Sequence, residues 1–380
     1  MSPTISIAGR AIGPGQPVYV IAELSANHHR NFAQAVRLIH AAKEAGADAV
    51  KLQTYTPDTM TIRCHRPEFE IGGGTLWDGR QLHDLYSEAA MPWDWQPKLK
   101  AVADEVGIAL FSTPYDPTAV EFLESVGVPA YKIASFEIVD LPLIQRAAET
   151  GKPLLLSTGM ATRDEISEAV RTASDAGAGG VALLKCTSAY PAPPDEMHLR
   201  SIPHLAREFA CPVGLSDHTL GIAVAVASVA LGACLVEKHL TASRAVPGPD
   251  TAFSLEPHEF RAMVEAIRQV EKALGEARFG PGAAEAGCRA FRRSLFVVAD
   301  VRAGEEFTRR NVRSIRPGHG LPPKQLSAIL GRAAASDIER GTPLTWQLIA
   351  GPDSPNSPHD EDPTSPQREQ GSSLVCEVNG

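Results

Sequence analysis

The sequence predicts an α/β protein, a (β/α)8 TIM barrel followed by a small C-terminal domain. From Val18 to Leu274, apolar strand-like runs alternate with amphipathic helical stretches eight times. The runs are apolar almost throughout, as expected of strands that are buried on both faces. Charged or hydroxyl residues follow most runs, at the edge where barrels of this kind place their active sites. An open doubly wound sheet is the alternative, but it normally has fewer units, and no GxGxxG follows the first strand.

We expect the eight strands at residues 18–24, 49–55, 108–113, 130–135, 153–158, 181–186, 212–216 and 234–239. Helices lie between them, such as 32–45 and 260–274, where apolar residues recur on one face. The connection over residues 57–97 is the longest, and it carries Trp77, Tyr86, Trp93 and Trp95. This insertion is either a lid over a substrate or simple packing.

Composition excludes several classes of protein. The chain has 380 residues, 43% hydrophobic and 21% charged, with a net charge of −9. No apolar run is long enough to cross a membrane and the start has no signal-peptide core, so we expect a cytoplasmic protein with no membrane partner. There is no basic field to attract nucleic acid. The six cysteines are scattered without metal-type spacing, which predicts mostly buried thiols.

The pattern changes after Leu274. We expect the barrel domain to span residues 1–278, a linker 279–290, and a small β-rich domain 291–350 with strands at 294–298, 313–316 and 341–344. Residues 351–380 form an acidic tail rich in proline and serine, with too few apolar residues to bury, and we expect it to be disordered.

One expected strand, 234–239, ends in a histidine, and another, 212–216, is followed by a histidine two residues later. Val213 begins a run that reaches His218, Leu235 begins one that reaches His239, and 21 residues separate the two histidines. That distance is the length of one turn, helix and strand, so neighbouring parallel strands would bring both imidazoles to one end of the sheet. A cation could be held between them. The alternative is two separate histidines, one capping a helix and one buried and hydrogen-bonded.

Two lysines, Lys51 and Lys132, lie near the ends of their strands. Hydroxyls that could surround them come from Thr113, Ser135, Ser157, Ser188 and Ser216. Cations among small donors favour an anion such as phosphate. Alternatively, a lysine pairs with Glu23 or Glu237, or one lysine forms a Schiff base as in an aldolase. Glu137 follows Ser135 by two residues, so an extended backbone would turn both to one side, where the carboxylate could act as an acid or base.

These residues stand in motifs that resemble the sialic acid synthase family. The motifs are IAELSANHHRN, GADAVKLQTYTPDTMT, YKIASFEIVDLP, LLLSTGMAT, LLKCTSAYPAP, GLSDHT and EKHLT, and RSIRPGHGLPP resembles its antifreeze-like (SAF) domain. Within the family, IAELSAN, LQTYTPDT, GTLWDGRQLHDLY and ASFEIVD are most similar to pseudaminic acid synthases. The chain departs from the family pattern at His29-Arg30 and at Met91.

The resemblance implies condensation of phosphoenolpyruvate with an open-chain amino sugar, here 2,4-diacetamido-2,4,6-trideoxy-altrose, to give pseudaminate and phosphate. It makes His218 and His239 ligands of a divalent metal, usually manganese, with magnesium or cobalt as alternatives. It makes Glu137 the acid or base, with Glu23 assisting the water or the sugar. Phosphoenolpyruvate would be bound by Lys51, Thr113, Lys132, Ser135, Ser157, Ser188 and Ser216. The sugar would be bound by Gln53, Tyr190, Asp250 and Arg316.

The resemblance also implies a domain-swapped homodimer, because Arg316 corresponds to an arginine that enters the barrel of the other subunit. Two further functions stay open. One is an N-acetylneuraminate or legionaminate synthase that uses another amino sugar. The other is a noncatalytic sugar-binding barrel.

Overall fold

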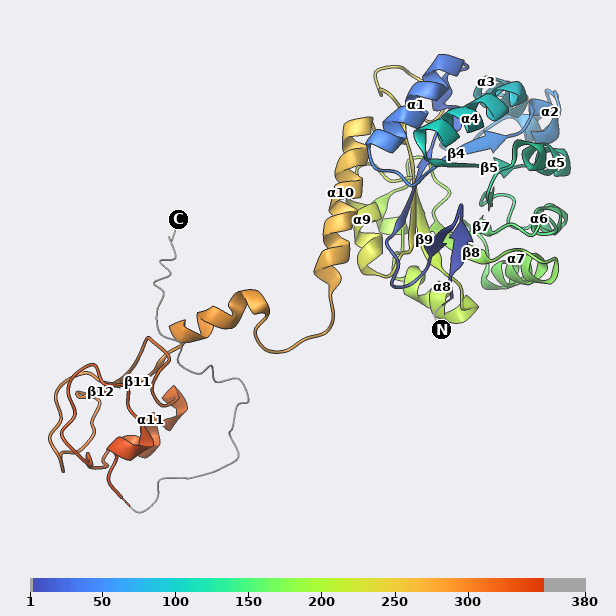
Figure 1. The fold of residues 1–380 in the computed structure, drawn as a ribbon. Coiled ribbons are helices and arrows are strands. Elements are labelled where there is room, and N and C mark those ends of the chain that lie inside the picture. The colour runs from blue at the N-terminus through green and yellow to red at the C-terminus, as the bar shows by residue number, and fades with distance from the viewer. Residues whose placement is uncertain (1–2, 352–380) are drawn as a thin grey trace. The chain divides into compact units, whose positions relative to one another are not determined.

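The protein is described here by a computed structural model that covers residues 3–351, and the chain divides into two units after Glu276 (Figure 1). The tail predicted to be disordered therefore lies outside the described residues, apart from Gly351. Among the described helices, none combines the length and the apolar character that crossing a membrane requires.

The first unit is a closed barrel of eight parallel strands, as the sequence predicts. The strands are β3 (Tyr19–Glu23), β4 (Ala49–Thr54), β5 (Ala109–Pro114), β6 (Tyr131–Ile133), β7 (Leu154–Ser157), β8 (Val181–Cys186), β9 (Val213–Asp217) and β10 (Leu235–His239). They pair in chain order, and β10 closes the barrel on β3. The expected strand bounds agree within one or two residues, and β6 is shorter than expected because the chain turns after Ile133.

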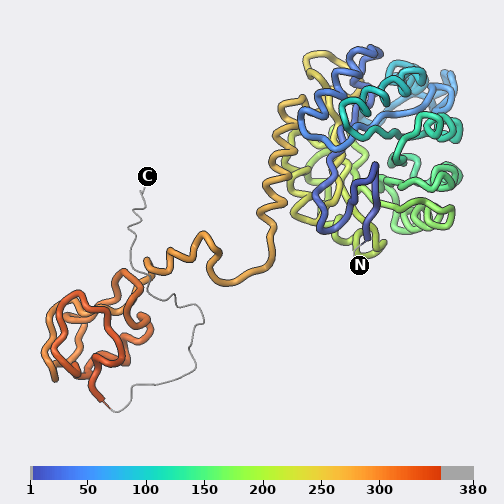
Figure 2. Tube along the Cα trace, in the orientation of Figure 1, coloured from blue at the N-terminus to red at the C-terminus, as the bar shows by residue number. Residues whose placement is uncertain are grey.

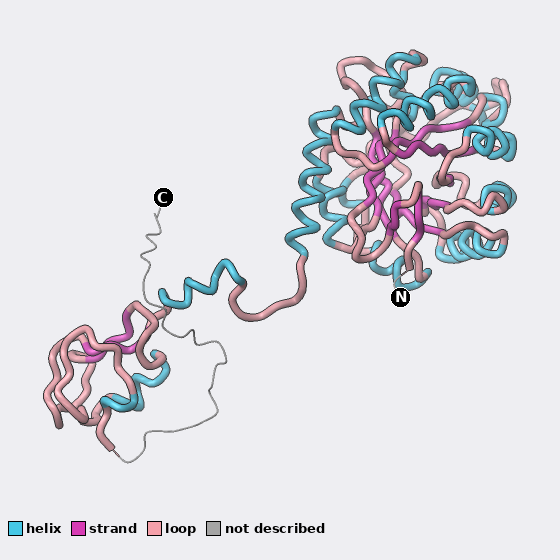
Figure 3. The backbone as a smooth tube through the Cα atoms, viewed as in Figure 1, coloured by secondary structure: helices cyan, strands magenta, loops and turns pink. Residues whose placement is uncertain are grey.

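Helices surround the strands of the barrel (Figure 3). They are α1 (Phe32–Glu44), α4 (Gln96–Val106), α5 (Pro117–Val126), α6 (Leu141–Ala148), α7 (Arg163–Asp175), α8 (Ser201–Phe209), α9 (Ala223–Ala230) and α10 (Pro257–Leu274). Their apolar faces pack on the strands in two hydrophobic clusters. Side-chain caps set several starts: Asn31 caps α1, Asp116 caps α5, and Thr162 forms a capping box with Glu165 at α7.

The insertion between β4 and α4 contains two helices of its own, α2 (Pro57–Met60) and α3 (Leu82–Ala89). It is fastened to the rest of the barrel unit by indole hydrogen bonds. Trp93 Nε1 donates to the Tyr55 carbonyl at 3.1 Å, and Trp77 Nε1 donates to the Pro249 carbonyl at 3.1 Å.

A β-hairpin at the amino ends of the strands was not anticipated. β1 (Ile5–Ile7) pairs antiparallel with β2 (Arg10–Ile12), shown in blue in Figure 2. Ile5, Ile7 and Ile12 are buried in the same cluster as Tyr19 and Leu235 at the strand starts. The hairpin turn is Ala8-Gly9, with φ of 49° and 80°. A two-residue turn of this hand favours Asn or Asp followed by Gly, so alanine hid the signal.

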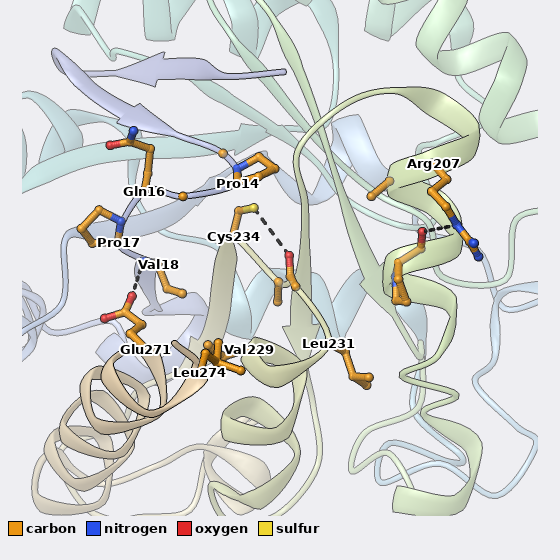
Figure 4. A pocket seen from close by; sticks show the side chains of 16 residues that line it. Pro14, Gln16, Pro17, Val18, Arg207, Val229, Leu231, Cys234, Glu271 and Leu274 are labelled. Atoms are coloured by element: carbon orange, nitrogen blue, oxygen red, sulfur yellow. Dashed lines mark hydrogen bonds between the residues drawn. The ribbon is translucent and has the colours of Figure 1, made fainter. Parts of the chain in front are cut away.

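A hollow of about 940 Å³ lies among the segment that follows β2 (residues 13–18), α8, α9 and the end of α10 (Figure 4). Its surface is mainly apolar, with Pro14, Pro17, Leu231 and Leu274 among its residues, and Cys234 at its side. The Cys234 thiol contacts the Gly232 carbonyl at 3.6 Å.

The second unit has its own small core of Leu295, Val297, Val301, Phe307, Val312 and neighbours. β11 (Ser294–Val297) pairs antiparallel with β12 (Val312–Ile315), and α11 spans Leu326–Ile329. Two expected strands are thus present, whereas residues 341–344 form only an isolated bridge from Pro343 to Phe296. A 3₁₀ helix, Ala283–Phe291, occupies most of the segment predicted as a linker.

Five of the six cysteines lie in the described part of the chain, and all five are free thiols. Cys186, Cys211 and Cys234 are buried, Cys64 is partly buried, and Cys288 is exposed. The prediction of scattered, mostly buried thiols is confirmed for these five.

Candidate active site

The strand register brings the predicted residues together at the carboxyl end of the barrel. Glu23 pairs with Lys51 on one side and with His239 on the other, and Glu237 pairs with Ser216. A cavity of about 400 Å³ opens above these strand ends, a size that suits a small ligand. Most of the predicted site residues line it: Glu23, Lys51, Gln53, Lys132, Ser135, Glu137, Ser157, Tyr190, Ser216, His218, His239 and Asp250.

Lys51 is held by two carboxylates at the floor of the cavity. Its Nζ lies 2.6 Å from Glu23 Oε2 and 3.4 Å from Glu237 Oε1, and it donates to Thr113 Oγ1 at 3.2 Å. Burial alone would lower the pKa of Lys51, but the two carboxylates outweigh it and raise that pKa. The pairing that the sequence left as an alternative therefore exists for Lys51.

Lys132 is buried without a carboxylate within ion-pair distance among the described residues. Its Nζ donates to the neighbouring Ile133 carbonyl at 3.3 Å. Burial lowers the pKa of Lys132, although Glu237 works in the opposite direction. A buried amine with spare donors is the better anion ligand of the two lysines.

Several buried polar atoms at the cavity have no hydrogen-bond partner among the described residues. They are Glu137 Oε2, Ser157 Oγ, Glu237 Oε2 and His239 Nδ1. Buried polar atoms are almost always paired in folded proteins, and a cluster of exceptions around one cavity indicates a ligand that completes them. Ser135 and Ser188 instead bond to each other, with their hydroxyl oxygens 2.7 Å apart.

Two carboxyl groups in the cavity titrate near neutral pH. Burial raises the pKa of Glu23 to about 7 against the opposing charge of Lys51. Burial likewise raises the pKa of Glu137 to about 7, with Lys132 opposing. Groups with such values exchange protons readily at neutral pH, as acid–base catalysis requires.

One detail of the Glu137 prediction is wrong. The backbone does not continue extended past Ser135, because β6 ends at Ile133 and the Glu137 amide donates to the Ala134 carbonyl in a turn. Ser135 and Glu137 both line the cavity nonetheless. The turn, and not an extended strand, directs the Glu137 side chain toward it.

The two histidines lie together, with ring centroids 5.5 Å apart. His218 Nδ1 lies 2.9 Å from the Thr187 carbonyl, which can only accept, so Nδ1 carries a proton and the Nε2 lone pair is free in the neutral ring. Burial lowers the pKa of His239 well below its usual range, which keeps that ring neutral. Burial alone would lower the pKa of His218, but Cys186 beside it raises that pKa, so a cation there would displace a proton.

These two rings fit a divalent cation that takes its other ligands from substrate or water. Within residues 3–351, no group of three or more His, Cys, Asp or Glu side chains could hold a metal on its own. Neutral imidazoles are good ligands for divalent transition-metal ions. His239 Nδ1 has no hydrogen-bond partner among the described residues.

The aromatic residues around the histidines were only partly foreseen. Tyr190 lies 4.3 Å from the His218 ring between centroids, and Phe253 lies 5.0 Å from the His239 ring. Trp77 of the insertion packs on Tyr190 at 5.7 Å. Phe253 was missed because it belongs to a short 3₁₀ turn, Thr251–Phe253, beyond the last strand, where strand-end reasoning does not reach.

Three predicted site residues do not line the cavity. Thr113 accepts a hydrogen bond from Lys51, and Ser188 shares a hydrogen bond with Ser135, and both of these partners line the cavity. Arg316 is exposed on the second unit. Tyr55 and Tyr115 do line the cavity, with ring centroids 5.2 Å apart, and were not predicted. Both directly follow barrel strands of the structure. Tyr55 is the last residue of the expected strand 49–55, and Tyr115 lies two residues past the expected strand 108–113, so a closer reading of these two strand ends would have found them.

Comparison with known proteins agrees with this geometry. Residues 38–279 match the NeuB family and residues 292–350 match the SAF domain. The chain belongs to the NeuB family. It is 44% identical over 332 residues to the pseudaminic acid synthase of Helicobacter pylori, covering 87% of this chain and 97% of that protein. It is 35% identical to the N,N'-diacetyllegionaminic acid synthase of Legionella pneumophila, covering 89% of this chain and 96% of that one.

A solved structure gives the same result. The N-acetylneuraminic acid synthetase of Leptospira borgpetersenii, crystallised with citrate, superposes with a TM-score of 0.68 at 31% identity, covering 76% of this chain and 95% of that one. The resemblance to sialic acid synthases and the predicted combination of barrel and SAF domain are thus confirmed.

Proposed function

We propose that the protein is a pseudaminic acid synthase, which condenses phosphoenolpyruvate with 2,4-diacetamido-2,4,6-trideoxy-altrose and water to give pseudaminate and phosphate. One observation supports the reaction class above others. A single cavity at the barrel's carboxyl end contains two lysines, two facing histidines and carboxyl groups with pKa near 7. The choice of sugar rests on the similarity to the pseudaminic acid synthases.

Phosphoenolpyruvate would bind through the cations and hydroxyls of the floor. Lys132 supplies donors free of any carboxylate partner among the described residues, and the hydroxyls of Ser157 and Ser216 line the same cavity, with that of Ser216 also donating to Glu237. Lys51 supplies a second positive charge, already balanced by Glu23 and Glu237. The cavity can therefore bind an anion through Lys132 and Lys51. Before the anion binds, the carboxylates of Glu23 and Glu237 keep the cavity from carrying a large excess of positive charge.

His218 and His239 would hold the metal ion that the enzymes of this family use in general. Manganese is the proposed ion, with magnesium or cobalt as alternatives. When bound, such an ion would polarise and orient the aldehyde oxygen of the sugar.

Side chains of the protein would carry out the proton transfers of the reaction. C3 of phosphoenolpyruvate attacks the aldehyde carbon, water adds at C2, and the adduct expels phosphate. Glu137, whose pKa is raised to about 7, would give up and accept a proton during these steps, and Glu23, which lines the same cavity, would orient the water or the sugar. Gln53, Tyr190 and Asp250 line the part of the cavity that we assign to the sugar.

Charge supports the proposal that Arg316 acts in a swapped homodimer. Residues 277–351 contain 12 Arg and Lys against 6 Asp and Glu, whereas residues 1–276 contain 23 against 33. The second unit is thus basic and the barrel acidic, so a second unit and a barrel attract each other electrostatically, as docking of one copy's second unit on another copy's barrel would require. A cytoplasmic location remains a prediction.

The test is phosphate release from phosphoenolpyruvate and manganese with three sugars in parallel, each with a chelator control. The sugars are the diacetamido-trideoxy-altrose, its legionaminate-type isomer and N-acetylmannosamine. We expect turnover of the altrose sugar alone, abolished by chelation. Turnover of another sugar alone would replace the substrate, and no release with any sugar would favour the noncatalytic sugar-binding alternative.

A Schiff-base aldolase is the second candidate, because burial lowers the pKa of Lys132 as an amine nucleophile requires. Borohydride reduction in the presence of the sugar separates the two mechanisms. Irreversible labelling of Lys132 would favour the aldolase, and an unmodified chain would favour the synthase.

A further inference from the structure

The cavity has two walls of different chemistry. The strand ends contribute mainly charged and polar side chains, among them Glu23, Lys51, Lys132, His218 and Glu237. The insertion contributes a mainly apolar set: Met60, Ile71, Thr75, Trp77, Leu82, Leu85, Tyr86 and Ala89. We call this second set the insertion wall.

Helix α3 presents one face to the cavity. Leu82, Leu85, Tyr86 and Ala89 recur at the i, i+3, i+4 and i+7 spacing of a single helical stripe, and all four line the cavity. Asp84 and Glu88 on the other side of the helix are exposed. The helix is therefore amphipathic, with its apolar face turned to the cavity.

This apolar stripe does not serve the core of the barrel. Among the described residues, neither Leu82 nor Leu85 belongs to the hydrophobic clusters that join strands to helices. Met91, two residues past the end of α3, does belong to one of these clusters. The insertion thus contacts the core of the barrel through Met91 and not through Leu82 or Leu85. An apolar helix face directed at a cavity indicates an apolar part of the ligand.

The insertion wall also offers few hydrogen bonds. The Trp77 indole nitrogen already donates to the Pro249 carbonyl. Thr75 and Tyr86 provide the only side-chain hydroxyls of the set. A substrate hydroxyl against this wall would lose water without gaining a full set of partners.

We propose that Met60, Ile71 and the Leu82–Leu85 face of α3 bind the methyl end of the sugar and select 6-deoxy over 6-hydroxy substrates. The inference rests on the proposed function, which directs the aldehyde end of the sugar to the histidines and so leaves its far end for the insertion. A hydrophobic pocket rejects an added hydroxyl only moderately, by on the order of 100-fold. The selectivity is expected in that range or somewhat below it.

The first experiment compares two sugars that differ only at C6: 2,4-diacetamido-2,4,6-trideoxy-altrose and its 6-hydroxy counterpart. We expect the wild-type kcat/KM to favour the 6-deoxy sugar by about 10- to 100-fold. Efficient turnover of both sugars with equal kcat/KM would overturn the inference and leave the proposed function intact. Absence of phosphate release with both would overturn the proposed function itself.

The second experiment assigns the selectivity to the wall. Met60→Gln and Leu82→Gln keep the length or bulk of the side chain and add a donor and an acceptor. One added hydrogen bond should reduce the preference for the 6-deoxy sugar by roughly 2- to 12-fold. Met60→Leu should leave the preference unchanged.

Leu76→Gln is the matched control, because Leu76 lies in the same insertion, is 53% exposed and does not line the cavity. It should leave the ratio of the two kcat/KM values at the wild-type level. Thermal melting of each variant checks that it folds. If Met60→Gln and Leu82→Gln fold and lower kcat/KM equally for both sugars, the wall has only a structural role and the inference is wrong.

Discussion

The two ends of the barrel differ in kind although the same eight strands form both. At the amino end, Ile5, Ile7 and Ile12 of the hairpin pack against Tyr19 and Leu235, and the buried side chains are apolar. At the carboxyl end, the buried side chains include Glu23, Lys51, Lys132, Glu237 and both histidines. One end is built from contacts that stabilise the fold, and the other gathers charges that cost free energy to bury.

This contrast separates stability from activity along the strand direction. Changes at the amino end should alter the free energy of unfolding and leave the reaction alone. Changes to the side chains that line the cavity at the carboxyl end should alter the reaction and leave the fold in place or stabilise it.

The largest effect is expected at the histidines. His239→Ala or His218→Ala should lower kcat/KM by on the order of 1000-fold or more, since the proposed metal and its polarisation of the aldehyde would be lost. The thermal midpoint without metal should stay within a few degrees of wild type. Phosphate release and manganese binding by calorimetry provide the measurements, and unchanged activity in both variants would remove the histidines from the mechanism.

A buried ion pair between β9 and β10 contributes to stability although it lies next to the two histidines. Lys238 Nζ lies 2.7 Å from Asp217 Oδ2, and both side chains are fully buried. Lys238→Met leaves a buried carboxylate unpaired and should destabilise the protein by about 3–5 kcal/mol. Denaturant unfolding measures this loss, and Lys185→Met, at a half-buried lysine without an ion pair among the described residues, should cost less.

At the amino end, Ile7→Ala should remove buried apolar volume and cost about 2–4 kcal/mol of stability. Activity at a temperature where the variant is folded should equal that of wild type. The matched control is Ile62→Ala, where the side chain is 60% exposed and little change is expected. A large loss of kcat/KM in folded Ile7→Ala would break the separation of the two ends.

The smallest effect is a pH-dependent one at Glu137. Its pKa is raised to about 7 in the fold from a usual value of 4.5, so the folded state binds this proton more tightly than the unfolded chain does. The resulting stability is present below pH 4.5 and is lost as pH rises through 7.

Glu137→Gln should therefore stabilise the protein at pH 8 by roughly 1–2 kcal/mol and have little effect at pH 4.5. Thermal melts at the two pH values measure this difference. An equal effect at both pH values would mean that burial does not raise the pKa of the Glu137 carboxyl group.

Much of the barrel could be predicted because strands buried on both faces leave long apolar runs, and their ends are marked by residues such as Lys51, His218 and His239. The pairing of Lys51 with Glu23 and Glu237 could only be posed as an alternative, since three different strands supply the partners. The position of Glu137 depends on a turn after Ile133 that carries no Gly or Pro signal.

The insertion was the hardest part to predict. The helical spacing of Leu82, Leu85 and Ala89 is present in the sequence, but spacing alone does not say whether an apolar face meets a core or a cavity. Trp77 shows the same problem, because its partner, the Pro249 carbonyl, is 172 residues further along the chain.

The insertion wall lies outside the hydrogen-bonded ladder of the barrel, because residues 57–90 contribute no strand to it. Substitutions in α3 can therefore accumulate without disturbing the strand pairing that aligns the histidines and lysines. A new sugar preference could arise by drift in this one segment, and a laboratory exchange of residues 57–90 between synthases would carry substrate choice with it.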